Sequence, residues 1–183
     1  NMLAVGQKGV LVFRITAHGT GGHSSLPELG ESAVHKLIDV LSHWRTLDWG
    51  EDVLLGKSLL NIGVIQGGVG MNVLAPEAYA EGIFRVATSL FDIQSIIRST
   101  LPADVEIDVP SASDPQRMLM IPDFETTVVG FGTDAAYLRP LGDIVLYGAG
   151  TIEVAHRDNE HVLVSDMEKA VDDYVRIVRY LLS

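Results

Sequence analysis

A turn between residues 147 and 161 holds the densest group of side chains that could do chemistry: Tyr-Gly-Ala-Gly-Thr-Ile-Glu-Val-Ala-His-Arg-Asp-Asn-Glu-His. It follows the apolar run 143–147, which has the composition of a buried strand. Sheets of α/β proteins place their ligands beyond the carboxyl ends of such strands. His156 is therefore a candidate metal ligand and Glu160 a candidate partner for it. Gly150 marks a point where the backbone can come close to a ligand.

His156 also has a structural interpretation, because a single histidine after a strand often only hydrogen-bonds to backbone. A zinc site needs at least three protein ligands. The chain has no cysteine, so a transition metal would have to be held by histidine and carboxylate, which favours zinc, manganese or cobalt. For His161 the simplest interpretation is an exposed surface histidine.

Further polar candidates stand in other loops and strands. His23 lies in the glycine-rich turn 19–27, where it could be an ordinary turn histidine. That turn lacks the lysine and serine of a phosphate-binding loop. Arg85, in the apolar run Ile-Phe-Arg-Val, either binds an anion or points from its strand into solvent. Asn72 lies before that strand, and Thr133 begins a pair typical of a helix N-cap.

Composition limits the class of protein. The chain has 183 residues, 47% of them hydrophobic and 20% charged, which is typical of a folded globular protein. Its net charge of −11 argues against nucleic acid as a partner. No apolar run is long enough to span a bilayer and no signal peptide is recognisable, so no membrane partner and a cytoplasmic location are expected. The first residues run straight into a strand, which suggests that the chain begins inside a longer one.

The first 110 residues show alternating strand and helix patterns. Strands are predicted at 9–18, 58–66, 77–86 and 104–109, and helices at 31–44 and about 90–101. Residues 45–57 read as a loop, and the proline-containing segment 110–115 as a linker. The order β-α-β-β-α-β predicts a ferredoxin-like sandwich over residues 9–110.

Residues 116–183 differ in kind. Short strands are predicted at 125–129 and 143–147 and a helical turn at 134–138. The closing helix is predicted to begin with a capping box of Ser165 and Glu168 and to run to Leu182. Its inward side is expected to carry Ala170, Val171, Tyr174, Val175, Ile177, Val178 and Leu181. Two strands and one long helix cannot close a core alone, so this segment is expected to end a larger α/β domain.

These motifs, taken in order, resemble one enzyme family. They are Lys8-Gly9, Gly-Gly-His23-Ser-Ser-Leu-Pro, Gly-Gly-Val-Gly-Met-Asn72 with Phe-Arg85, Gly-Thr133-Asp-Ala, and Gly-Ala-Gly150 with Ala-His156 and Glu160. The chain resembles the dinuclear zinc amidohydrolases and metallopeptidases that include acetylornithine deacetylase, succinyl-diaminopimelate desuccinylase, aminoacylase and glutamate carboxypeptidase. The sequence around Gly150 looks most similar to that of acetylornithine deacetylase, an enzyme of arginine biosynthesis.

The resemblance implies an α+β fold of two parts. Residues 9–110 would be a ferredoxin-like lid and dimerisation domain, and residues 116–183 the carboxyl-terminal part of a zinc-peptidase-like α/β catalytic domain. It implies a homodimer formed through the lid. It also implies two zinc ions per full-length active site, with cobalt or manganese as alternatives.

The resemblance also implies roles for the candidate residues. His156 would bind one zinc ion, with Glu160 behind it, and His23 of the neighbouring subunit would stabilise the oxyanion. Asn72 and Arg85 would hold the carboxylate or carbonyl of an N-acyl amino acid or small peptide. Gly150 would offer a backbone donor, and Thr133 would line the pocket.

One departure from the family is large. Its His-x-Asp motif, bridging aspartate and Glu-Glu pair lie upstream of the lid, and none of them is in this chain. The expectation is therefore a fragment, inactive alone, of an N-acetylornithine-type deacylase that uses metal-activated water. A metallo-carboxypeptidase or dipeptidase of the same family is one alternative. A non-catalytic dimerising or small-molecule-binding module is another.

Overall fold

The computed structural model describes all 183 residues and divides them into two compact units. The central unit contains residues 8–115. The terminal unit combines residues 1–7 with residues 116–183. Each unit is described by itself. None of the helices is both long enough and apolar enough to cross a membrane.

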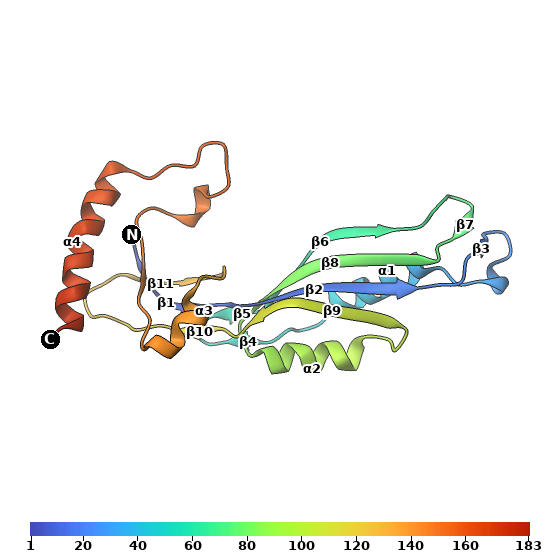
Figure 1. Cartoon of the computed structure of the whole chain (residues 1–183), viewed down its shortest axis with the longest axis horizontal. Coiled ribbons are helices and arrows are strands. Elements are labelled where there is room, and N and C mark those ends of the chain that lie inside the picture. Colours follow the sequence, from blue (N-terminus) through green and yellow to red (C-terminus); the bar gives the residue numbers. More distant parts are fainter. The chain divides into compact units, whose positions relative to one another are not determined.

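The central unit is a four-stranded antiparallel sheet with two helices. Its strands are β2 (Gly9–His18), β6 (Leu59–Gly67), β8 (Glu77–Val86) and β9 (Val105–Ser113), and they lie side by side in the order β6-β8-β2-β9 (Figure 1). Helix α1 (Ala33–Trp44) connects β2 to β6, and α2 (Leu90–Thr100) connects β8 to β9. This is the predicted βαββαβ arrangement, and the α+β fold class is confirmed.

Alternation of side chains fixes which face of this sheet is covered. Along β2, Leu11, Phe13 and Ile15 are buried and pack in one core with residues of both helices. The residues between them, such as Arg14, lie on the other face. Period-two alternation therefore leaves one face of the sheet open and one under the helices.

Aromatic rings fill the core of the central unit. The Trp44 ring is fully buried and lies 5.6 Å from that of Phe13 and 5.7 Å from that of Trp49. Its indole Nε1–H donates to Thr100 Oγ1 at 3.2 Å. Large rings with a satisfied polar atom supply much of the burial energy of a domain of this size.

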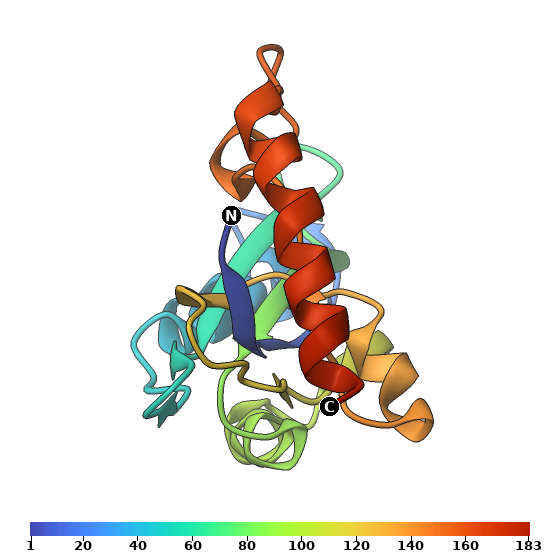
Figure 2. The same cartoon turned by 90° about the vertical axis from the view of Figure 1, so that its left-hand side faces the viewer.

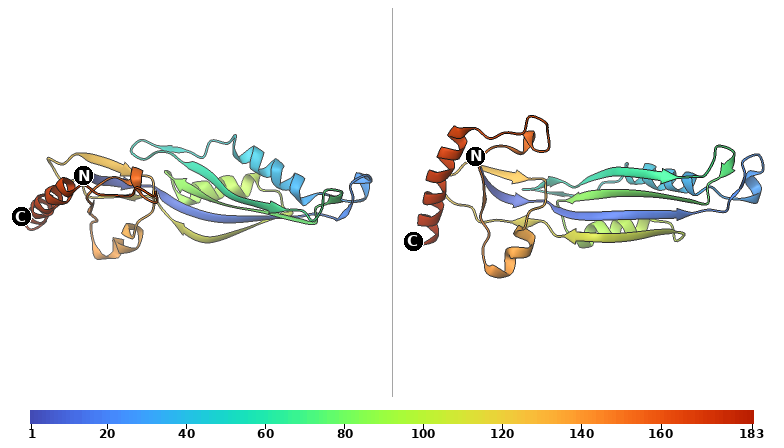
Figure 3. Two further views of the ribbon diagram at one scale, coloured as in Figure 1. Left: turned by 90° about the horizontal axis from the view of Figure 1, so that it is seen from above. Right: turned by 45° about the horizontal axis from the view of Figure 1, so that its top comes forward.

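Small elements form the ends of the central unit. Strand β3 (Gly22–His23) pairs with β7 (Val73–Leu74), and η1 (Pro27–Leu29) follows β3. We call residues 19–31 together with 68–76 the tip, which lies beyond the His18 end of β2 (Figure 3). Strands β4 (Glu51–Asp52) and β5 (Gly56–Lys57) form a hairpin in the segment predicted as a loop.

The terminal unit is organised around β1 (Leu3–Gln7), all of whose residues are buried. Its partners are β10 (Gln116–Arg117) and β12 (Leu146–Tyr147), both antiparallel, and β11 (Thr126–Val129), which is parallel. The remaining elements are α3 (Ala135–Leu138), η2 (Arg139–Leu141), η3 (Ile152–Val154) and α4 (Val164–Leu181). Figure 2 shows α4 in front of β1, where Ile177 packs against Leu3 and Ile121.

Strand β9 is longer than predicted. Residues 110–113, predicted as part of a linker, continue the strand because Ser111, Ala112 and Ser113 pair with Val12, Leu11 and Val10 of β2. The register shifts between Val12 and Arg14, and Pro110 falls at that irregularity. Proline is tolerated there because it has no ladder hydrogen bond to lose.

Two predictions about α4 are wrong. The helix begins at Val164 after Leu163, and Ser165 does not act as the N-cap, so the predicted capping box does not form. The buried residues of the helix are Ala170, Asp173 and Ile177. Of the residues expected to face inward, Val171, Tyr174, Val175, Val178 and Leu181 are exposed. The helix packs through a narrow stripe, and most of its wider apolar face is exposed, although the Tyr174 ring contacts that of Tyr147.

Candidate functional site

His23 and Asn72 lie together at the tip of the central unit. His23 pairs with Val73 in the β3–β7 ladder, and the backbone N–H of Ser24 donates to the carbonyl oxygen of Asn72 at 3.0 Å. Residues 49 positions apart are joined because β3 and β7 pair. The structure therefore brings these two predicted site residues into one place.

The ring of His23 is exposed and bonded on one side. Its Nδ1 lies 2.7 Å from Ser25 Oγ, and the backbone N–H of Ser25 donates to the same nitrogen at 3.3 Å. The Nε2 atom makes no hydrogen bond within the chain, so it is the ring nitrogen left for a ligand.

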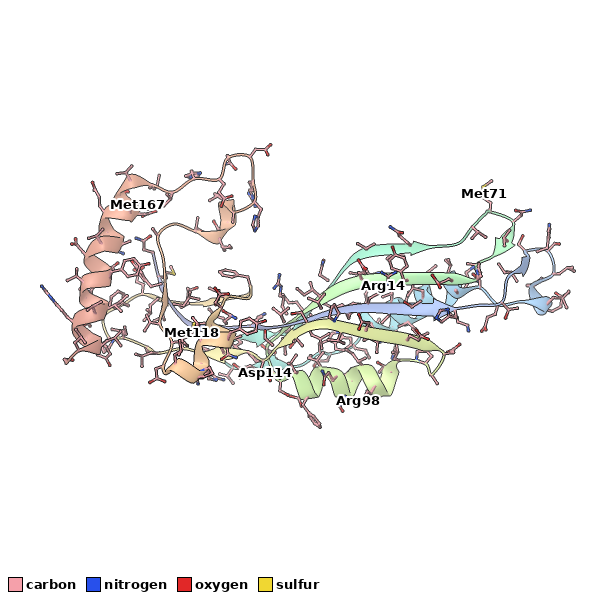
Figure 4. All side chains as sticks on the ribbon, in the orientation of Figure 1. Arg14, Met71, Arg98, Asp114, Met118 and Met167 are labelled. Atoms are coloured by element: carbon pink, nitrogen blue, oxygen red, sulfur yellow. The ribbon has the colours of Figure 1, made fainter.

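The tip also exposes large apolar side chains around His23 and Asn72. These are Leu26, Leu29, Val69, Met71 and Val73. Met71, labelled in Figure 4, lies in the turn beside Asn72. Apolar groups gathered on an exposed loop mark a surface that contacts a ligand or another protein.

Arg85 lies at the other end of the same sheet. In register it is paired with Val10 and Leu59, on the open face. The position of Arg85 in β8 is eight residue steps from that of Glu77 at the tip end, which is about 26 Å of strand. Within one central unit, Arg85 therefore does not share a small ligand with His23.

Arg85 is a half-buried residue, and its guanidinium makes no hydrogen bond or ion pair. Arg14 on the same open face is a useful contrast (Figure 4). Its Nη1 lies 3.1 Å from Glu81 Oε1, and its guanidinium carbon lies 3.7 Å from the centre of the Tyr79 ring. Of these two arginines, only Arg85 is left free for an anion.

In the terminal unit, the turn after β12 places Gly150 with φ +86°, a left-handed conformation that favours glycine. The backbone N–H of Gly150 donates to Asn1 Oδ1 at 3.0 Å. Asn1 Nδ2 in turn donates to the carbonyl oxygen of Asp166 at 2.7 Å. The donor predicted for a substrate oxygen is thus bound to a side-chain amide oxygen in this structure.

A cavity of about 510 Å³ lies beside this turn. Its lining includes Gly148, Gly150, Val129, Phe131 and Ile152, and no charged side chain. A site with this lining would hold an uncharged or apolar group.

His156 and Glu160 are joined through the backbone. His156 has φ +61°, which is unusual for a residue with a side chain, and its N–H donates to Glu160 Oε2 at 3.1 Å. The N–H of Glu160 donates to the carbonyl oxygen of Arg157 at 3.0 Å. The imidazole of His156 is exposed and unbonded, so it is free to bind a ligand.

Thr133 is held by Gln7, a residue that sequence reasoning missed. Its hydroxyl donates to Gln7 Oε1 and accepts the N–H of Ala135 at 3.2 Å. Gln7 is fully buried in β1, and its Nε2 has no partner. The hydroxyl proton of Thr133 is therefore used within the terminal unit.

Tyr147 and Asp173 form a second contact that the sequence did not reveal. The Tyr147 hydroxyl donates to Asp173 Oδ2, and Arg176 Nη1 donates to Asp173 Oδ1 at 2.9 Å. The hydrogen bond from Tyr147 holds the pKa of Asp173 below its usual value, although burial opposes this. Burial, followed by the bond to Asp173, raises the pKa of Tyr147. The pair fastens α4 to the strand that precedes Gly148.

The central unit defines a class of protein, a peptidase dimerisation domain. The family model of that name, from the M20 peptidases, matches residues 5–101. The chain belongs to the M20 peptidase family.

Curated relatives agree with this assignment. A Peptidase M20 domain-containing protein of Schizosaccharomyces pombe is 38% identical over 185 residues, covering 100% of this chain. A probable carboxypeptidase of Neosartorya fischeri is 34% identical over 203 residues, covering 98% of this chain. This chain spans 46% of the length of each of these two proteins.

Solved structures share the fold. The aminopeptidase PepT of Bacillus cereus matches with a TM-score of 0.74 at 18% identity, over 99% of this chain and 54% of its own. A tripeptidase of Staphylococcus aureus matches with a TM-score of 0.72 at 20% identity, over 91% of this chain and 50% of its own. At such identities the likeness concerns the fold.

M20 peptidases are generally metal-dependent, so a metal would need ligands close together in this chain. No three His, Asp or Glu side chains lie close enough together to bind a metal ion. The His156 ring has no companion ligand, and the nearby Glu160 carboxylate is bonded to backbone. The residues of this chain do not complete a metal site by themselves.

Proposed function

We propose that this chain forms the lid and the carboxyl-terminal part of the catalytic domain of a metal-dependent amide hydrolase. Its substrate would carry a free α-carboxylate on the amine side of the scissile amide. N-acyl amino acids, such as N-acetylornithine, and peptides cut at their carboxyl-terminal residue both contain that bond. The observation that carries the proposal is the unpaired guanidinium of Arg85 on the open face of the sheet.

The guanidinium nitrogens of Arg85 have no partner in the chain, and none of them is buried out of reach of solvent, so they are open to a ligand. A carboxylate is the group that its forked donors fit best. Arg85 would therefore bind the substrate carboxylate. Arg14, which is already paired with Glu81, would not.

The position of His23 supports a site shared by two copies of the chain. His23 and Arg85 lie at opposite ends of one sheet, separated by at least about 26 Å of strand. A small substrate held by Arg85 could meet a His23 only from another copy.

The two edges of the sheet differ in a way that supports dimerisation through β6. The β9 edge carries Glu106, Asp108 and Pro110, which discourage pairing with another strand. Strand β6 has no charged residue and no proline, and it exposes Leu59, Val64 and Ile65. An unprotected edge of this kind is suited to pairing with a second copy.

Antiparallel pairing of two β6 strands about a two-fold axis would align opposite ends of the two sheets. Centred on Gly63, it would set Leu59 of one copy beside Gly67 of the other. Leu59 is paired with Arg85 in β8, and Gly67 leads into the tip. The arrangement would bring the tip of one copy toward the Arg85 end of the other.

The terminal unit has the surface of an incomplete domain. Its helix α4 exposes apolar residues at spacings of three and four, namely Val164, Met167, Val171, Tyr174, Val178 and Leu181. A stripe of this kind normally faces a core. We propose that it packs against the rest of the catalytic domain, which would also supply the remaining metal ligands and the general base.

In this proposal His23 donates a hydrogen bond from Nε2 to the oxygen that becomes negative in the tetrahedral intermediate. Arg85 and Asn72 orient the substrate. His156 is one ligand of the metal, proposed as zinc, which activates water when bound. Without the other ligands and the base, this chain alone is expected to be inactive.

Complementation between two inactive variants tests the shared site. In the complete dimeric enzyme, His23→Ala and Arg85→Ala should each lower turnover by about 10²-fold or more. Mixed and re-dimerised, they should regain about a quarter of wild-type activity, because half of the dimers are mixed and each has one intact site. Arg14→Ala is the matched control and should retain activity.

If the mixture stays inactive although mixed dimers form, the two residues act within one subunit and the proposal of a shared site is wrong. If His23→Ala alone leaves turnover unchanged, the oxyanion role is wrong. Full activity in Arg85→Ala would exclude it as the carboxylate-binding residue.

Two candidate activities, deacetylation and carboxypeptidase activity, differ in the acyl side of the substrate. Deacetylation of N-acetylornithine is supported by the resemblance of the motif around Gly150 to acetylornithine deacetylase. Carboxypeptidase activity is supported by the names of relatives such as the probable carboxypeptidase of Neosartorya fischeri. The apolar residues of the tip and the uncharged lining of the cavity support a larger apolar group over acetyl. A panel of acetyl-amino acids and blocked dipeptides, compared by kcat/KM, decides between them.

A non-catalytic dimerising module is the other class. The complete protein would then dimerise and bind a small carboxylate without turnover of any amide in the panel. Turnover of one substrate that is abolished by His156→Ala excludes this alternative.

A further inference from the structure

The turn that follows His23 places one residue against its imidazole. The N–H of Leu26 donates to the carbonyl oxygen of His23 at 2.9 Å and closes the turn. Ser25, inside this turn, directs both its backbone N–H and its hydroxyl at Nδ1 of the ring, at 3.3 Å and 2.7 Å. The His23 ring is thus in contact with two groups of one neighbour.

The nature of these two groups decides where the ring proton lies. A backbone N–H can only donate, so the atom that it faces must be an acceptor. Nδ1 of His23 therefore carries no proton in this arrangement, and the Ser25 hydroxyl is free to donate to it as well. A proton on Nδ1 would point at the N–H of Ser25. The neutral ring is left with its proton on Nε2, the nitrogen without a partner in the chain.

His161 shows the opposite arrangement in the same chain. Its Nδ1 lies 2.7 Å from the carbonyl oxygen of Asn159, which can only accept. The proton of a neutral His161 ring is therefore on Nδ1. The two histidines give opposite assignments from the same rule.

We propose that Ser25 is a positioning residue that fixes His23 in its Nε2–H tautomer and presents that N–H at the tip. The inference rests on the proposed function, in which His23 donates to the oxyanion, and adds the residue that makes it a donor. A ring with its proton on Nδ1 would present a lone pair at Nε2, which would repel a developing negative charge.

The tautomers can be measured without substrate, metal or turnover. Ring-¹⁵N-labelled histidine in the 183-residue chain, at alkaline pH where the rings are neutral, gives separate nitrogen shifts for protonated and unprotonated positions. His23 should show an unprotonated Nδ1, and His161 a protonated one. In Ser25→Ala the ratio of Nδ1–H to Nε2–H forms at His23 should rise by up to about fivefold, the ratio typical of one hydrogen bond.

Two variants control this measurement. Ser25→Thr keeps a hydroxyl and should keep the wild-type tautomer. Ser24→Ala changes the adjacent exposed serine, whose contact with Asn72 is made by backbone, and should leave His23 unchanged. A protonated Nδ1 at His23 in the wild-type chain, or the same tautomer ratio in wild type and Ser25→Ala, would overturn the proposal.

Kinetics of the complete enzyme separate this inference from the proposed function. Ser25→Ala should lower kcat by a few-fold with KM unchanged, because the donor acts on the transition state. A changed tautomer with unchanged kcat would count against the oxyanion role of His23 and leave the tautomer assignment standing. An unchanged tautomer would refute the role of Ser25 whatever the kinetics.

Discussion

The carboxylate of Glu160 accepts a hydrogen bond from the backbone N–H of His156, at 3.1 Å, while His156 has φ +61°. The left-handed conformation costs a residue with a side chain about 1–2 kcal/mol. The bond from Glu160 helps to offset that cost and sets the direction in which the imidazole leaves the backbone. Glu160 therefore acts on the main chain of His156, in the turn that also contains Gly150.

Loss of the Glu160 carboxylate should loosen this turn. In Glu160→Ala, the His156 amide should exchange about three- to tenfold faster with solvent, since a bond to an exposed charged group is lost. The measurement is amide hydrogen exchange by NMR on the metal-free chain. Glu160→Gln keeps an oxygen acceptor and should behave like wild type, and Glu153→Ala, in the same turn, is a matched control. Equal exchange in Glu160→Ala and wild type would show that the bond has no such role.

A positive charge on the β6 edge should prevent dimerisation. Ile65 is 60% exposed on that strand. In a pair of β6 strands, Ile65→Lys would place two like charges near the two-fold axis and bury them. Sedimentation velocity should then show a monomer, whereas the wild-type chain is expected to form a dimer. Val109→Lys, on the opposite edge, should stay dimeric, and a dimer in both variants would exclude the β6 interface.

Truncation of Trp44 should destabilise the central unit and leave the terminal unit unaffected. Trp44→Ala removes a fully buried ring that contacts Phe13, Trp49 and Phe84, and should cost about 3–5 kcal/mol of unfolding free energy. Both tryptophans of the chain lie in this core, so tryptophan fluorescence in urea follows the central unit alone. Ile177→Ala, in the terminal unit, should not move that transition. A shared shift would show that the two units unfold together.

The Tyr147–Asp173 contact should make the terminal unit sensitive to acid. The pKa of Asp173 is lower in the folded chain than in the unfolded one. Its stabilisation is therefore complete above the unfolded value, about 3.9, and is lost as pH falls through the folded value. Urea unfolding followed by the Tyr147 and Tyr174 ring resonances should show this loss as the pH falls below about 4.

Asp173→Asn should remove that pH dependence and lower stability by about 1–3 kcal/mol at neutral pH, because Asp173 is 4% exposed and bonded to two partners. Asp172→Asn, at the exposed neighbouring position, is the control and should keep the wild-type profile. If Asp173→Asn loses stability at low pH as the wild-type chain does, other carboxylates cause the pH dependence of the terminal unit.

Strand β1 was not among the strands predicted from the sequence. Five buried residues precede β2 with only Lys8 between them, and the apolar pattern alone does not separate the two strands. Which sheet a short strand joins depends on its partners, and those of β1 begin at Gln116, Thr126 and Leu146. That information is more than one hundred residues away and has no local signal.

For the closing helix α4, the sequence predicted the element but not which of its residues are exposed. Its sequence correctly predicted a helix, because apolar residues recur at three and four positions. The same pattern correctly predicted that Ala170 and Ile177 are buried, but it did not show that the other apolar residues are exposed here, since an exposed apolar stripe and a buried one look alike in sequence. Only the contacts of Ala170, Asp173 and Ile177 show which side is packed here.

The sequence by itself determined the βαββαβ order of the central unit, because strand and helix periodicities are local properties of the chain. It also supplied the candidate site residues, which stay a prediction, because their types and glycine-rich settings are local. The tertiary structure decided how they are grouped. It placed His23 beside Asn72 and at the opposite end of the sheet from Arg85, beyond about 26 Å of strand, since antiparallel strands turn a distance in sequence into a distance along a sheet. It also revealed Gln7, Ser25 and Asp173, whose importance lies in what they touch.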